Sequence, residues 1–369
     1  MLRIFCSPTR YVQGAGATSE LAAQLAHLAL GARTLVITTR SPRAALETVW
    51  RQSFAAHNLE MDIFDFGGEC FLAEIARGLA AAQRFNATTI LGAGGGKTLD
   101  MARAVAGALK LPIVCCPTTA ASDAPCSALS VIYSETGIFE AIQYYPRNPD
   151  LVLVDSAVIL RAPVRTFVAG MGDALATYFE ARACAMAGKA NVPGGSPTLA
   201  ALAIAELCYR TLLKDGSAAL SAVRQGVVTP AFENVVEANT LLSGIGFESA
   251  GLATAHSVHN GLTILPETHD FMHGEKVAIG TLAQLMLEER DSALLDEVYA
   301  FCRGVGLPVT LAEIGLDAFS RANAMAVATR ALANGESAHN EPFPVTADRL
   351  ADAILAADAY GKAFRERNL

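Results

Sequence analysis

The stretch TTILGAGGGKT, residues 88–98, carries the strongest indication of the fold. It opens with a short run of β-branched and aliphatic residues, and glycines follow that run directly. Lys97 and Thr98 then lead into residues 101–109, which have the composition of a helix. A buried strand that ends in a glycine turn and opens a helix is typical of the repeating units of parallel sheets.

The chain on both sides of this stretch repeats the same alternation. Further strand-like runs occur at 34–38, 61–66, 112–116 and 151–154, and helical stretches at 44–56 and 74–84. This order predicts a mostly parallel sheet with helices on both faces, in a Rossmann-like arrangement. After Pro163 the β-branched runs largely vanish, and long Ala- and Leu-rich stretches take over at 172–187, 198–213 and 277–289. We therefore predict an α/β dinucleotide-binding domain over 1–162 and an all-helical, metal-binding and catalytic domain over 163–369.

Composition narrows the class of protein. The 369 residues are 52% hydrophobic and 17% charged, which is enough apolar material for two large cores. The net charge of −8 and the lack of a Lys/Arg run argue against nucleic acid as a partner. No apolar stretch approaches the roughly 20 residues that cross a bilayer, and the N-terminus lacks a secretory h-region, so we expect a cytoplasmic protein with no membrane partner. The eight cysteines contain no Cys-x-x-Cys pair, which favours buried thiols over disulfides or a structural zinc site.

The glycine stretch 92–98 suits an anion. Glycines let backbone N–H groups approach a phosphate closely, and a helix N-terminus adds a favourable dipole. The P-loop pattern fails because Leu91 stands where its first glycine belongs, and the common dinucleotide fingerprint fails because Lys97 replaces its third glycine. A phosphate cradle of a less common pattern remains, suited to a pyrophosphate. The alternative is a tight strand-to-helix turn that binds no ligand.

Histidines gather in one short region. Four of the seven lie between residues 256 and 273: His256, His259, His269 and His273. The first two are three residues apart and share one face if they lie on a helix. Two imidazoles and one carboxylate would make three metal ligands and leave a coordination position open for a substrate. Asp173 in GMGDA, residues 170–174, is a candidate carboxylate, and its alternative role is the N-cap of a helix that begins there.

Taken together, these motifs resemble the iron-containing (group III) alcohol dehydrogenases. The resemblance rests on GGGKTLD (94–100), PTTAASDAP (117–125) and GMGDA (170–174). Within the family, SALSVIY (127–133), GFES (246–249), HSVHNGLT (256–263) and HGEKV (273–277) are similar to the glycerol dehydrogenase branch. The similarity extends from about residue 11 to beyond residue 333, which is nearly the whole chain.

The resemblance implies a role for each matching residue. The implied metal ligands are Asp173, His256 and His273, with zinc expected and iron as the alternative, and Asp123 would hydrogen-bond a substrate hydroxyl. The implied NAD contacts are Thr39, Gly94, Gly95, Gly96, Lys97, Thr98, Asp100, Thr118, Thr119, Ser127, Leu129 and Tyr133. His259 is expected to support a ligand rather than to be one. Members of the family are usually oligomeric, often octameric, so a homo-oligomer is expected.

One position departs from the family pattern. Members that prefer NAD usually carry an acidic residue after the second strand, where it binds the adenosine ribose, but this chain has Thr39 there with Arg40 beside it. A carboxylate would repel the 2′-phosphate of NADP, whereas threonine and arginine would not. NADP therefore stays open as a cofactor beside NAD.

The expected activity is hydride transfer from the secondary hydroxyl of glycerol, or of a related small vicinal diol, to NAD. A divalent metal would activate the hydroxyl, and the product would be dihydroxyacetone or a hydroxyketone. One alternative is a sister-fold dehydrogenase or synthase that acts on a phosphorylated substrate. Such an enzyme needs extra basic residues, and residues 247–276 offer only Lys276. The other alternative is a non-catalytic protein that binds a nucleotide and a metal.

Overall fold

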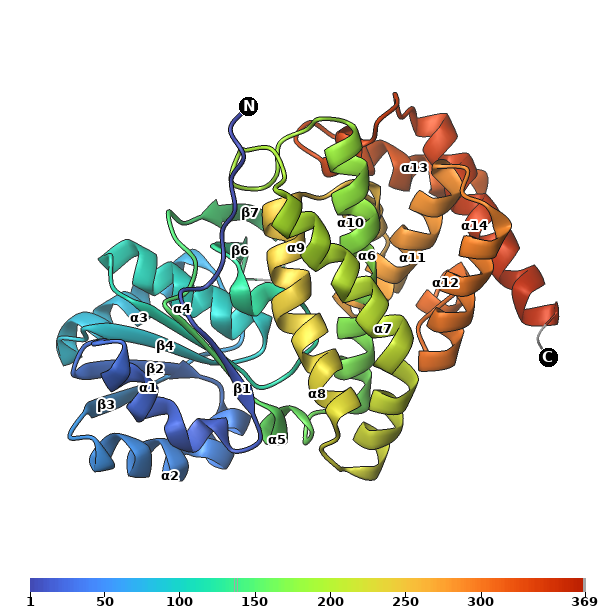
Figure 1. Ribbon diagram of the computed structural model, residues 1–369. Helices are drawn as coiled ribbons and strands as arrows, with labels where there is room; N and C mark the ends of the chain where they lie inside the picture. Colours follow the sequence, from blue (N-terminus) through green and yellow to red (C-terminus); the bar gives the residue numbers. More distant parts are fainter. Residues whose placement is uncertain (136, 138, 368–369) are drawn as a thin grey trace.

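An α/β part and a helical part lie side by side in the computed structural model, which describes residues 1–135, 137 and 139–367 (Figure 1). Among these residues, six strands form one parallel sheet in the order β1-β8-β5-β4-β2-β3. Its strands are β1 (Tyr11–Gly14), β2 (Arg33–Thr38), β3 (Glu60–Asp65), β4 (Thr89–Gly94), β5 (Ile113–Pro117) and β8 (Leu151–Asp155). The predicted mostly parallel sheet is confirmed, with each predicted strand within two or three residues of its observed bounds.

Helices cover both faces of this sheet, as predicted. Successive residues of a strand point to opposite faces, so each buried strand supplies two apolar surfaces. Val36, Leu91 and Val114 share a core with α1 (Leu21–His27) and α2 (Arg40–Ala56). Their neighbours in the same strands belong to a core with α3 (Leu72–Phe85) and α4 (Gly96–Leu109), and that core continues into the helical part. The sheet is therefore sandwiched between two helical layers, one of which connects it to the rest of the molecule.

Three strands were not predicted from the sequence. One is β1, which has only four residues and pairs with β8, about 140 residues further along the chain. The other two, β6 (Leu129–Tyr133) and β7 (Phe139–Tyr144), form an antiparallel pair outside the main sheet. Such short strands carry little local pattern, because their partners rather than their own composition stabilise them.

After β8 the described chain forms helices and turns but no further named strand, which confirms the all-helical second part. The helices are α5 (Ser156–Ile159), α6 (Val164–Met186), α7 (Leu199–Gln225), α8 (Pro230–Glu237), a π-helical turn (Ala238–Leu242), α9 (Ser243–Ala250), α10 (Thr254–Leu262), α11 (His273–Leu287), α12 (Ser292–Val305), α13 (Arg321–Ala331) and α14 (Ala347–Arg367). None of the helices in the described residues has both the length and the apolar character that a membrane span requires.

The proposed domain division at residues 162 and 163 falls in the connection between the two parts. The last strand ends at Asp155, and the long helix α6 begins at Val164. The N-terminal segment nevertheless crosses to the helical part, where the N–H of Ile4 donates to the carbonyl of Ser196 at 3.2 Å. The division therefore stays a prediction.

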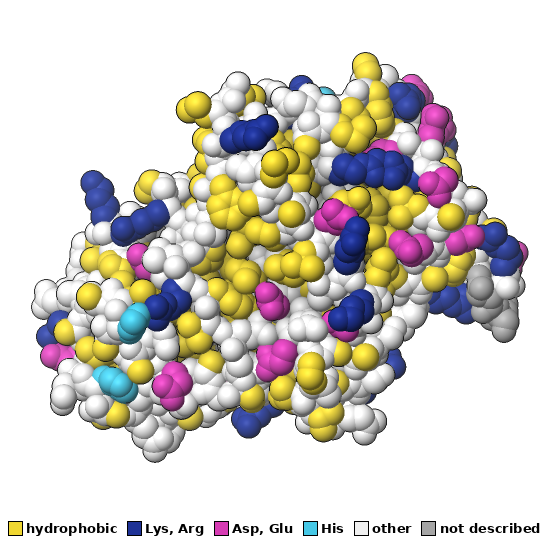
Figure 2. All heavy atoms as spheres, in the orientation of Figure 1, with side chains coloured by type: hydrophobic (Ala, Val, Ile, Leu, Met, Phe, Trp, Pro, Cys, Tyr) yellow, Lys and Arg dark blue, Asp and Glu magenta, His cyan; other side chains and the backbone are white. Residues whose placement is uncertain are grey.

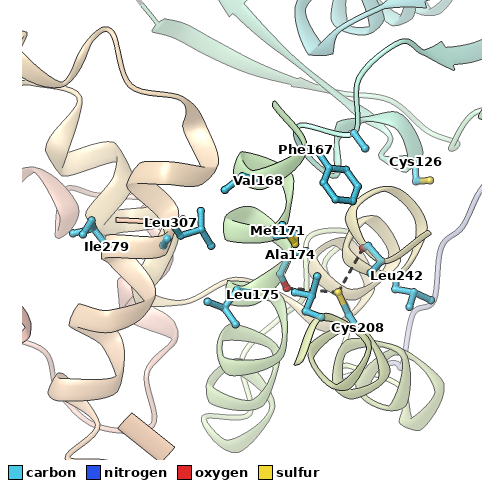
Figure 3. Packing of buried hydrophobic residues seen from close by; sticks show 14 of the residues in the cluster. Cys126, Phe167, Val168, Met171, Ala174, Leu175, Cys208, Leu242, Ile279 and Leu307 are labelled. Atoms are coloured by element: carbon cyan, nitrogen blue, oxygen red, sulfur yellow. Dashed lines mark hydrogen bonds between the residues drawn. The ribbon is translucent and has the colours of Figure 1, made fainter. Parts of the chain in front are cut away.

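Helix α6 is the central helix of the helical part and is buried on nearly every side. Val168 and Leu175 face Ile279 and Leu307 on one flank, and Ala174 faces Cys208 of α7 on the other (Figure 3). The Cys208 thiol donates to the carbonyl oxygen of Ala174 at 3.6 Å. A helix that is hydrophobic all round belongs in a core. The polar side chains in the middle of α6, such as those of Asp173 and Glu180, are therefore held in a rigid and dry environment.

The N-cap alternative for Asp173 is wrong. The helix begins nine residues earlier, at Val164, with Pro163 in the N-cap position, and Asp173 lies in its interior. Gly170 and Gly172 suggested an interruption, yet both are helical. They are needed because neighbouring backbone comes too close for a side chain: a Cβ atom on Gly170 would lie 1.8 Å from the carbonyl oxygen of Ala120, and one on Gly172 would lie 2.3 Å from that of Gly274.

The surface shown in Figure 2 has a broad apolar area across the middle of the molecule, around α7 and α9, with charged side chains mostly toward the edges. Leu199 and Leu207 of α7 are among the exposed large hydrophobic residues. An apolar area of this kind is compatible with the expected homo-oligomer. The assembly itself stays a prediction.

Candidate active site

Three side chains from three helices converge at one point. Asp173 comes from the middle of α6, His256 from the first turn of α10, and His273 is the first residue of α11. The Asp173 Oδ1 atom lies 3.3 Å from His256 Nε2 and 3.1 Å from His273 Nε2. The three potential ligand atoms all lie within 4.8 Å of one another. The structure thus brings together the three residues that the resemblance implied as metal ligands.

The Asp173 carboxylate fits a metal ion because of what surrounds it. Its side chain is wholly buried, and among the described residues Oδ1 has no hydrogen-bond donor. This oxygen lies within ion-pair distance of both imidazole Nε2 atoms but forms no well-oriented hydrogen bond in the described residues, and a cation between the imidazoles would satisfy it. Burial raises the pKa of Asp173, but His273 and His256 outweigh burial and hold this pKa far below its ordinary value. The carboxylate is therefore ionised, as a ligand must be.

His259 lies beside this cluster rather than in it. Its Nε2 atom is 3.0 Å from His273 Nδ1, and its Nδ1 atom is 3.0 Å from the side-chain oxygen of Asn260. If His273 Nε2 ligates a metal, its Nδ1 carries the proton and donates to His259, whose own proton then points to Asn260. The geometry thus favours the expected supporting role for His259. His269 is exposed and bonds through Nε2 to the Thr263 carbonyl at 3.0 Å, away from the cluster.

Glycines allow these segments to meet. A Cβ atom on Gly172 would lie 2.3 Å from the carbonyl oxygen of Gly274, and one on Gly274 would lie 1.8 Å from that of Ala169. Contacts this short cannot be relieved by a side-chain rotation, because the atoms belong to the backbone. Gly172, just before Asp173, and Gly274, just after His273, are therefore what lets α6 and α11 approach closely enough to share a ligand site.

Asp123 adjoins the same cluster from the α/β part. Its N–H donates to Asp173 Oδ2 at 3.2 Å, and its Oδ2 accepts a hydrogen bond from Ser243 Oγ at 3.1 Å. Thr177 supports Ser243 through a contact of 2.9 Å between the two hydroxyls. Burial and the negative charge of Asp173 raise the pKa of Asp123 well above its ordinary value. Asp123 is thus held in a fixed orientation beside the metal candidates, as its predicted role requires.

The predicted cofactor contacts gather at one edge of the sheet. Thr39 follows β2, Gly94 ends β4 with residues 95–98 after it, and Thr118 and Thr119 follow β5. These three strands are adjacent and parallel. Their carboxyl ends therefore lie at the same edge. The direction in which successive strands are added across the sheet reverses between β2 and β4: the strand after β2 is β3, on one side, and the strand after β4 is β5, on the other. Ligands of open α/β sheets bind at such switch points.

The glycine loop has room for an anion. Gly95 is the N-cap of α4, and Cβ atoms on Gly95 and Gly96 would have no neighbour closer than 3.9 and 4.0 Å. The first N–H groups of a helix have no partner within it, so this N-terminus presents donors to open space. Gly94 is different, because its Cβ would lie 2.5 Å from Thr98 Oγ1. The loop therefore combines a tight turn with an accessible cluster of N–H groups, which fits a phosphate.

Other predicted cofactor residues surround this loop. The Lys97 ammonium pairs with Glu69 and lies 5.0 Å from the ring centre of Tyr133, which brings β6 over the start of α4. Asp100 is buried in an ion pair with Arg103 at 2.9 Å. Ser127 is buried and Leu129 is half-buried at the entrance to β6. The predicted contacts of these five residues with a cofactor stay predictions.

A short segment connects the two halves of the site. At one end, the N–H of Thr118 donates to the carbonyl of Gly94 at 3.0 Å, and at the other end Asp123 contacts Asp173. In between, the Asn239 side chain donates to the carbonyl of Ala120 at 3.0 Å. The glycine loop and the metal candidates are thus joined by residues 118–123.

Several residues with clear roles in this geometry were missed from the sequence. Ser243 and Asn239 lie next to or within the π-helical turn, and such turns occur often at functional sites. Glu180 contacts His256, and its signal was an acidic residue two turns after Asp173 in a mostly apolar helix. Glu248, from the GFES motif, accepts a hydrogen bond from the Ala128 N–H at 2.7 Å and holds the segment that leads into β6. A sequence does not show that these residues share a neighbourhood.

Comparisons with known proteins agree with this geometry. Residues 8–156 match the family described as iron-containing alcohol dehydrogenase. A glycerol dehydrogenase from Thermotoga maritima is 50% identical over 96% of both chains, and a glycolaldehyde reductase from Halobacterium salinarum is 46% identical over 100% of both. The crystal structure of a glycerol dehydrogenase from Schizosaccharomyces pombe superimposes with a TM-score of 0.95 at 38% identity, covering 99% of this chain and 93% of that one. The chain belongs to the iron-containing alcohol dehydrogenase family.

Proposed function

We propose that this protein is a metal-dependent polyol dehydrogenase that transfers hydride between the secondary hydroxyl of glycerol, or of a related small vicinal diol, and NAD. The observation that carries the proposal is the buried cluster of Asp173, His256 and His273, with an unsatisfied carboxylate oxygen at its centre. The similarity to two dehydrogenases of glycerol over nearly full length gives the substrate class.

The residues of the site have distinct roles in this reaction. Asp173, His256 and His273 hold a divalent ion, zinc or iron, since two imidazoles and a carboxylate suit both metals. When bound, the ion lowers the pKa of a substrate hydroxyl, and NAD takes the hydride. Asp123 orients the substrate, because Ser243 occupies its Oδ2 and its other oxygen can accept a bond from a second hydroxyl. The buried residues of α6 close the site on the side of Asp173.

The glycine loop places the cofactor. The N–H groups at the start of α4 hold the pyrophosphate, with Gly94 to Thr98 around it. Thr118, Thr119, Ser127, Leu129 and Tyr133 line the nicotinamide side, Asp100 supports the loop from within α4, and Thr39 lies by the adenosine ribose. The site then lies between the predicted domains 1–162 and 163–369, as ligand sites often do. We assign the active form to a homo-oligomer.

Chelation tests the proposal directly. Removal of metal is expected to lower the rate of NAD reduction with glycerol by at least about a hundredfold, because the hydroxyl then lacks its activator. Adding back Zn²⁺ or Fe²⁺ should restore it, and absorbance of the reduced cofactor reports the rate. A rate that survives complete chelation would contradict the metal role. If 1,2-propanediol or 2,3-butanediol reacts and glycerol does not, the substrate assignment changes while the reaction class stands.

Glycolaldehyde reduction is the second candidate, favoured by the glycolaldehyde reductase relative. Reduction of glycolaldehyde gives ethylene glycol, so it is the reverse of oxidation at a primary hydroxyl rather than at the secondary hydroxyl of glycerol. A bound metal would polarise the aldehyde carbonyl, and the reduced cofactor would supply the hydride. Comparison of kcat/KM for glycerol oxidation with kcat/KM for glycolaldehyde reduction decides between the two substrates.

Thr39 is predicted to set the choice between NAD and NADP. It is the N-cap of α2, but in the described residues its side chain makes no capping hydrogen bond, so capping does not occupy the hydroxyl. Replacing Thr39 by Asp should raise the ratio of kcat/KM for NAD over NADP by about tenfold or more, because a carboxylate repels the 2′-phosphate and binds ribose hydroxyls. Thr39→Asn has nearly the same shape without the charge and serves as the control. If the parent already shows a KM for NADP a hundredfold above that for NAD, Thr39 does not permit NADP.

A further inference from the structure

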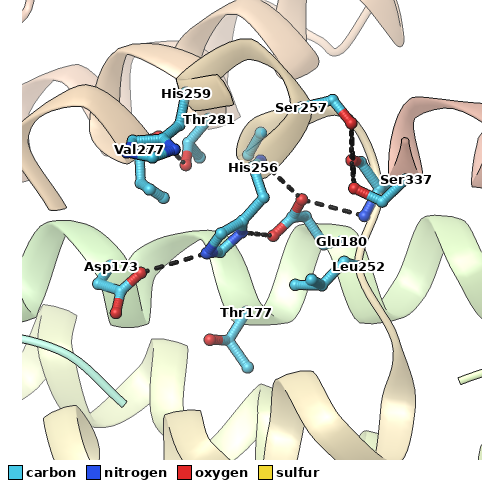
Figure 4. Close-up of polar contacts among 12 residues, drawn as sticks. Asp173, Thr177, Glu180, Leu252, His256, Ser257, His259, Val277, Thr281 and Ser337 are labelled. Atoms are coloured by element: carbon cyan, nitrogen blue, oxygen red, sulfur yellow. Dashed lines mark hydrogen bonds and ion pairs between the residues drawn. The ribbon is translucent and has the colours of Figure 1, made fainter. Parts of the chain in front are cut away.

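Glu180 is a buried carboxylate that the proposed reaction does not use. It lies on α6, seven residues after Asp173, and its side chain is fully buried. Its Oε2 atom lies 2.5 Å from His256 Nδ1, and its Oε1 accepts the N–H groups of Ala253 and His256, both at 3.0 Å. Every hydrogen bond of Glu180 in the described residues therefore goes to His256 or to the turn that carries it (Figure 4).

Glu180 caps the N-terminus of helix α10. Helix α10 begins at Thr254, and Ala253, in the N-cap position, has no side chain that could accept a hydrogen bond. The N–H groups of the first turn therefore need acceptors from elsewhere. Glu180 provides one from α6, and Gln284 of α11 provides another by accepting the N–H of Ala255 at 3.0 Å. The backbone that carries His256 is thus held by the same carboxylate that contacts its ring.

The contact with the ring determines which nitrogen of His256 carries a proton. A carboxylate accepts but does not donate, so Nδ1 must carry the hydrogen that points to Glu180. In a neutral imidazole, Nε2 is then an acceptor, and this atom faces Asp173. Since 173 and 180 are two helical turns apart, one helix holds His256 from both sides (Figure 4).

We propose that Glu180 is a positioning residue of the metal centre: by capping α10 and accepting the Nδ1 hydrogen of His256, it presents the Nε2 lone pair to the metal. The proposal rests on the metal site put forward under the proposed function. A hydrogen-bonded carboxylate behind a metal-bound histidine orients the ring and makes it a better ligand.

The variant Glu180→Gln distinguishes the orientation of His256 by Glu180 from the capping of helix α10. The amide oxygen of glutamine can still accept the backbone N–H groups of Ala253 and His256, so the cap is kept. The amide NH₂ then faces His256 Nδ1, which must become the acceptor, and the ring proton moves to Nε2, the nitrogen that should bind metal. The substitution therefore preserves the helix and disfavours the ligand.

The matched control is Glu341→Gln. Glu341 is also a buried glutamate of this region, and its Oε1 accepts a hydrogen bond from Thr254 Oγ1 at 2.5 Å, yet it contacts neither His256 nor Asp173. Burial raises the pKa of Glu341 to about 8. It is therefore largely protonated at neutral pH, so a neutral glutamine is a close replacement.

The measurement is the dissociation constant for Zn²⁺, obtained by competition with a chelator on the full-length apoprotein. We expect Glu180→Gln to weaken zinc binding by about 10- to 100-fold and Glu341→Gln to stay within twofold of the parent. The ligand-field absorption of bound Co²⁺ should also change in the first variant only, because the geometry around His256 is altered. Thermal unfolding of both metal-free variants should remain close to that of the parent.

Three results would overturn the inference. Zinc binding by Glu180→Gln within twofold of the parent would show that the carboxylate does not present His256 to the metal. An equal loss in both variants would mean that affinity follows packing around buried glutamates. A parent that binds no zinc would overturn the proposed metal site and this inference with it. If Glu180→Gln does not fold, Glu180→Asp replaces it, because the shorter carboxylate cannot reach the ring and the backbone together. Zinc affinity of Glu180→Asp equal to that of the parent would likewise overturn the inference.

Discussion

Replacing His256 by Ala is expected to abolish metal binding and to lower kcat/KM by at least about a thousandfold. The variant loses one of three ligands and leaves Asp173 and Glu180 with no imidazole between them. Loss of the activating charge removes several kcal/mol from stabilisation of the transition state, and each factor of ten corresponds to about 1.4 kcal/mol. Affinity for NAD should change little, because the glycine loop lies in the α/β part. Metal content by atomic spectroscopy, turnover with glycerol, and NAD binding by calorimetry test the three expectations.

His269→Ala is the control for this experiment. It removes a histidine from the same stretch of sequence, but His269 is exposed and lies outside the metal cluster. It should retain metal and activity. Because His256 is largely buried, its replacement can also destabilise the fold. His273→Ala is therefore a second variant, since the His273 side chain that it removes is 40% exposed. Normal metal content and turnover in both histidine variants would refute the ligand assignment.

Replacing Gly274 by Ala is expected to have the largest effect on the fold. A Cβ atom at this position would lie 1.8 Å from the carbonyl oxygen of Ala169 and 3.0 Å from the backbone nitrogen of Asp173. Helix α11 would have to move away from α6, at a cost to the free energy of unfolding of roughly 3 kcal/mol or more. The same movement carries His273 away from Asp173, so zinc affinity should fall at least about a hundredfold. Denaturant unfolding of the metal-free protein and zinc titration measure the two effects.

Gly304→Ala is the matched control for Gly274→Ala. Gly304 also lies in a helix, α12, but a Cβ atom there would meet nothing within 4 Å. Alanine favours the helical state by up to about 1 kcal/mol over glycine, so this variant should be as stable as the parent or slightly more stable. Equal stability and equal zinc affinity of the two variants would contradict the close-approach explanation for Gly274.

Much of the α/β part could be predicted because its pattern is local. Residues 89–94 are aliphatic and glycine-rich, and a buried parallel strand needs little more than such a run between turns. The helices next to the sheet likewise follow from composition. β1 and the β6–β7 pair could not be predicted, because short strands owe their existence to partners elsewhere in the chain. The start of α6 was misplaced for a related reason: Gly170 and Gly172 suggest an interruption unless the neighbouring backbone is known.

In the site, too, some residues could be predicted from the sequence and others could not. The identities of Asp173, His256 and His273 could be read from motifs, since a family resemblance preserves residue types in order. The arrangement of Glu180, Ser243 and Asn239 could not, because these residues lie in stretches with no motif of their own. Each acquires its role only from a contact with a residue far away in the chain, as when Ser243 donates to Asp123 across 120 positions.

The amino-acid sequence was thus sufficient for the class of fold, the family and the chemical types of the ligands, because these depend on local periodicity and on ordered motifs. Only the tertiary structure decided that one oxygen of Asp173 lies between two imidazoles without a well-oriented hydrogen bond in the described residues, that His259 lies against His273, and that Glu180 contacts His256 from the side opposite Asp173. The physical reason is that hydrogen-bond direction and burial are properties of packed side chains, and packing brings together residues whose separation in sequence carries no signal.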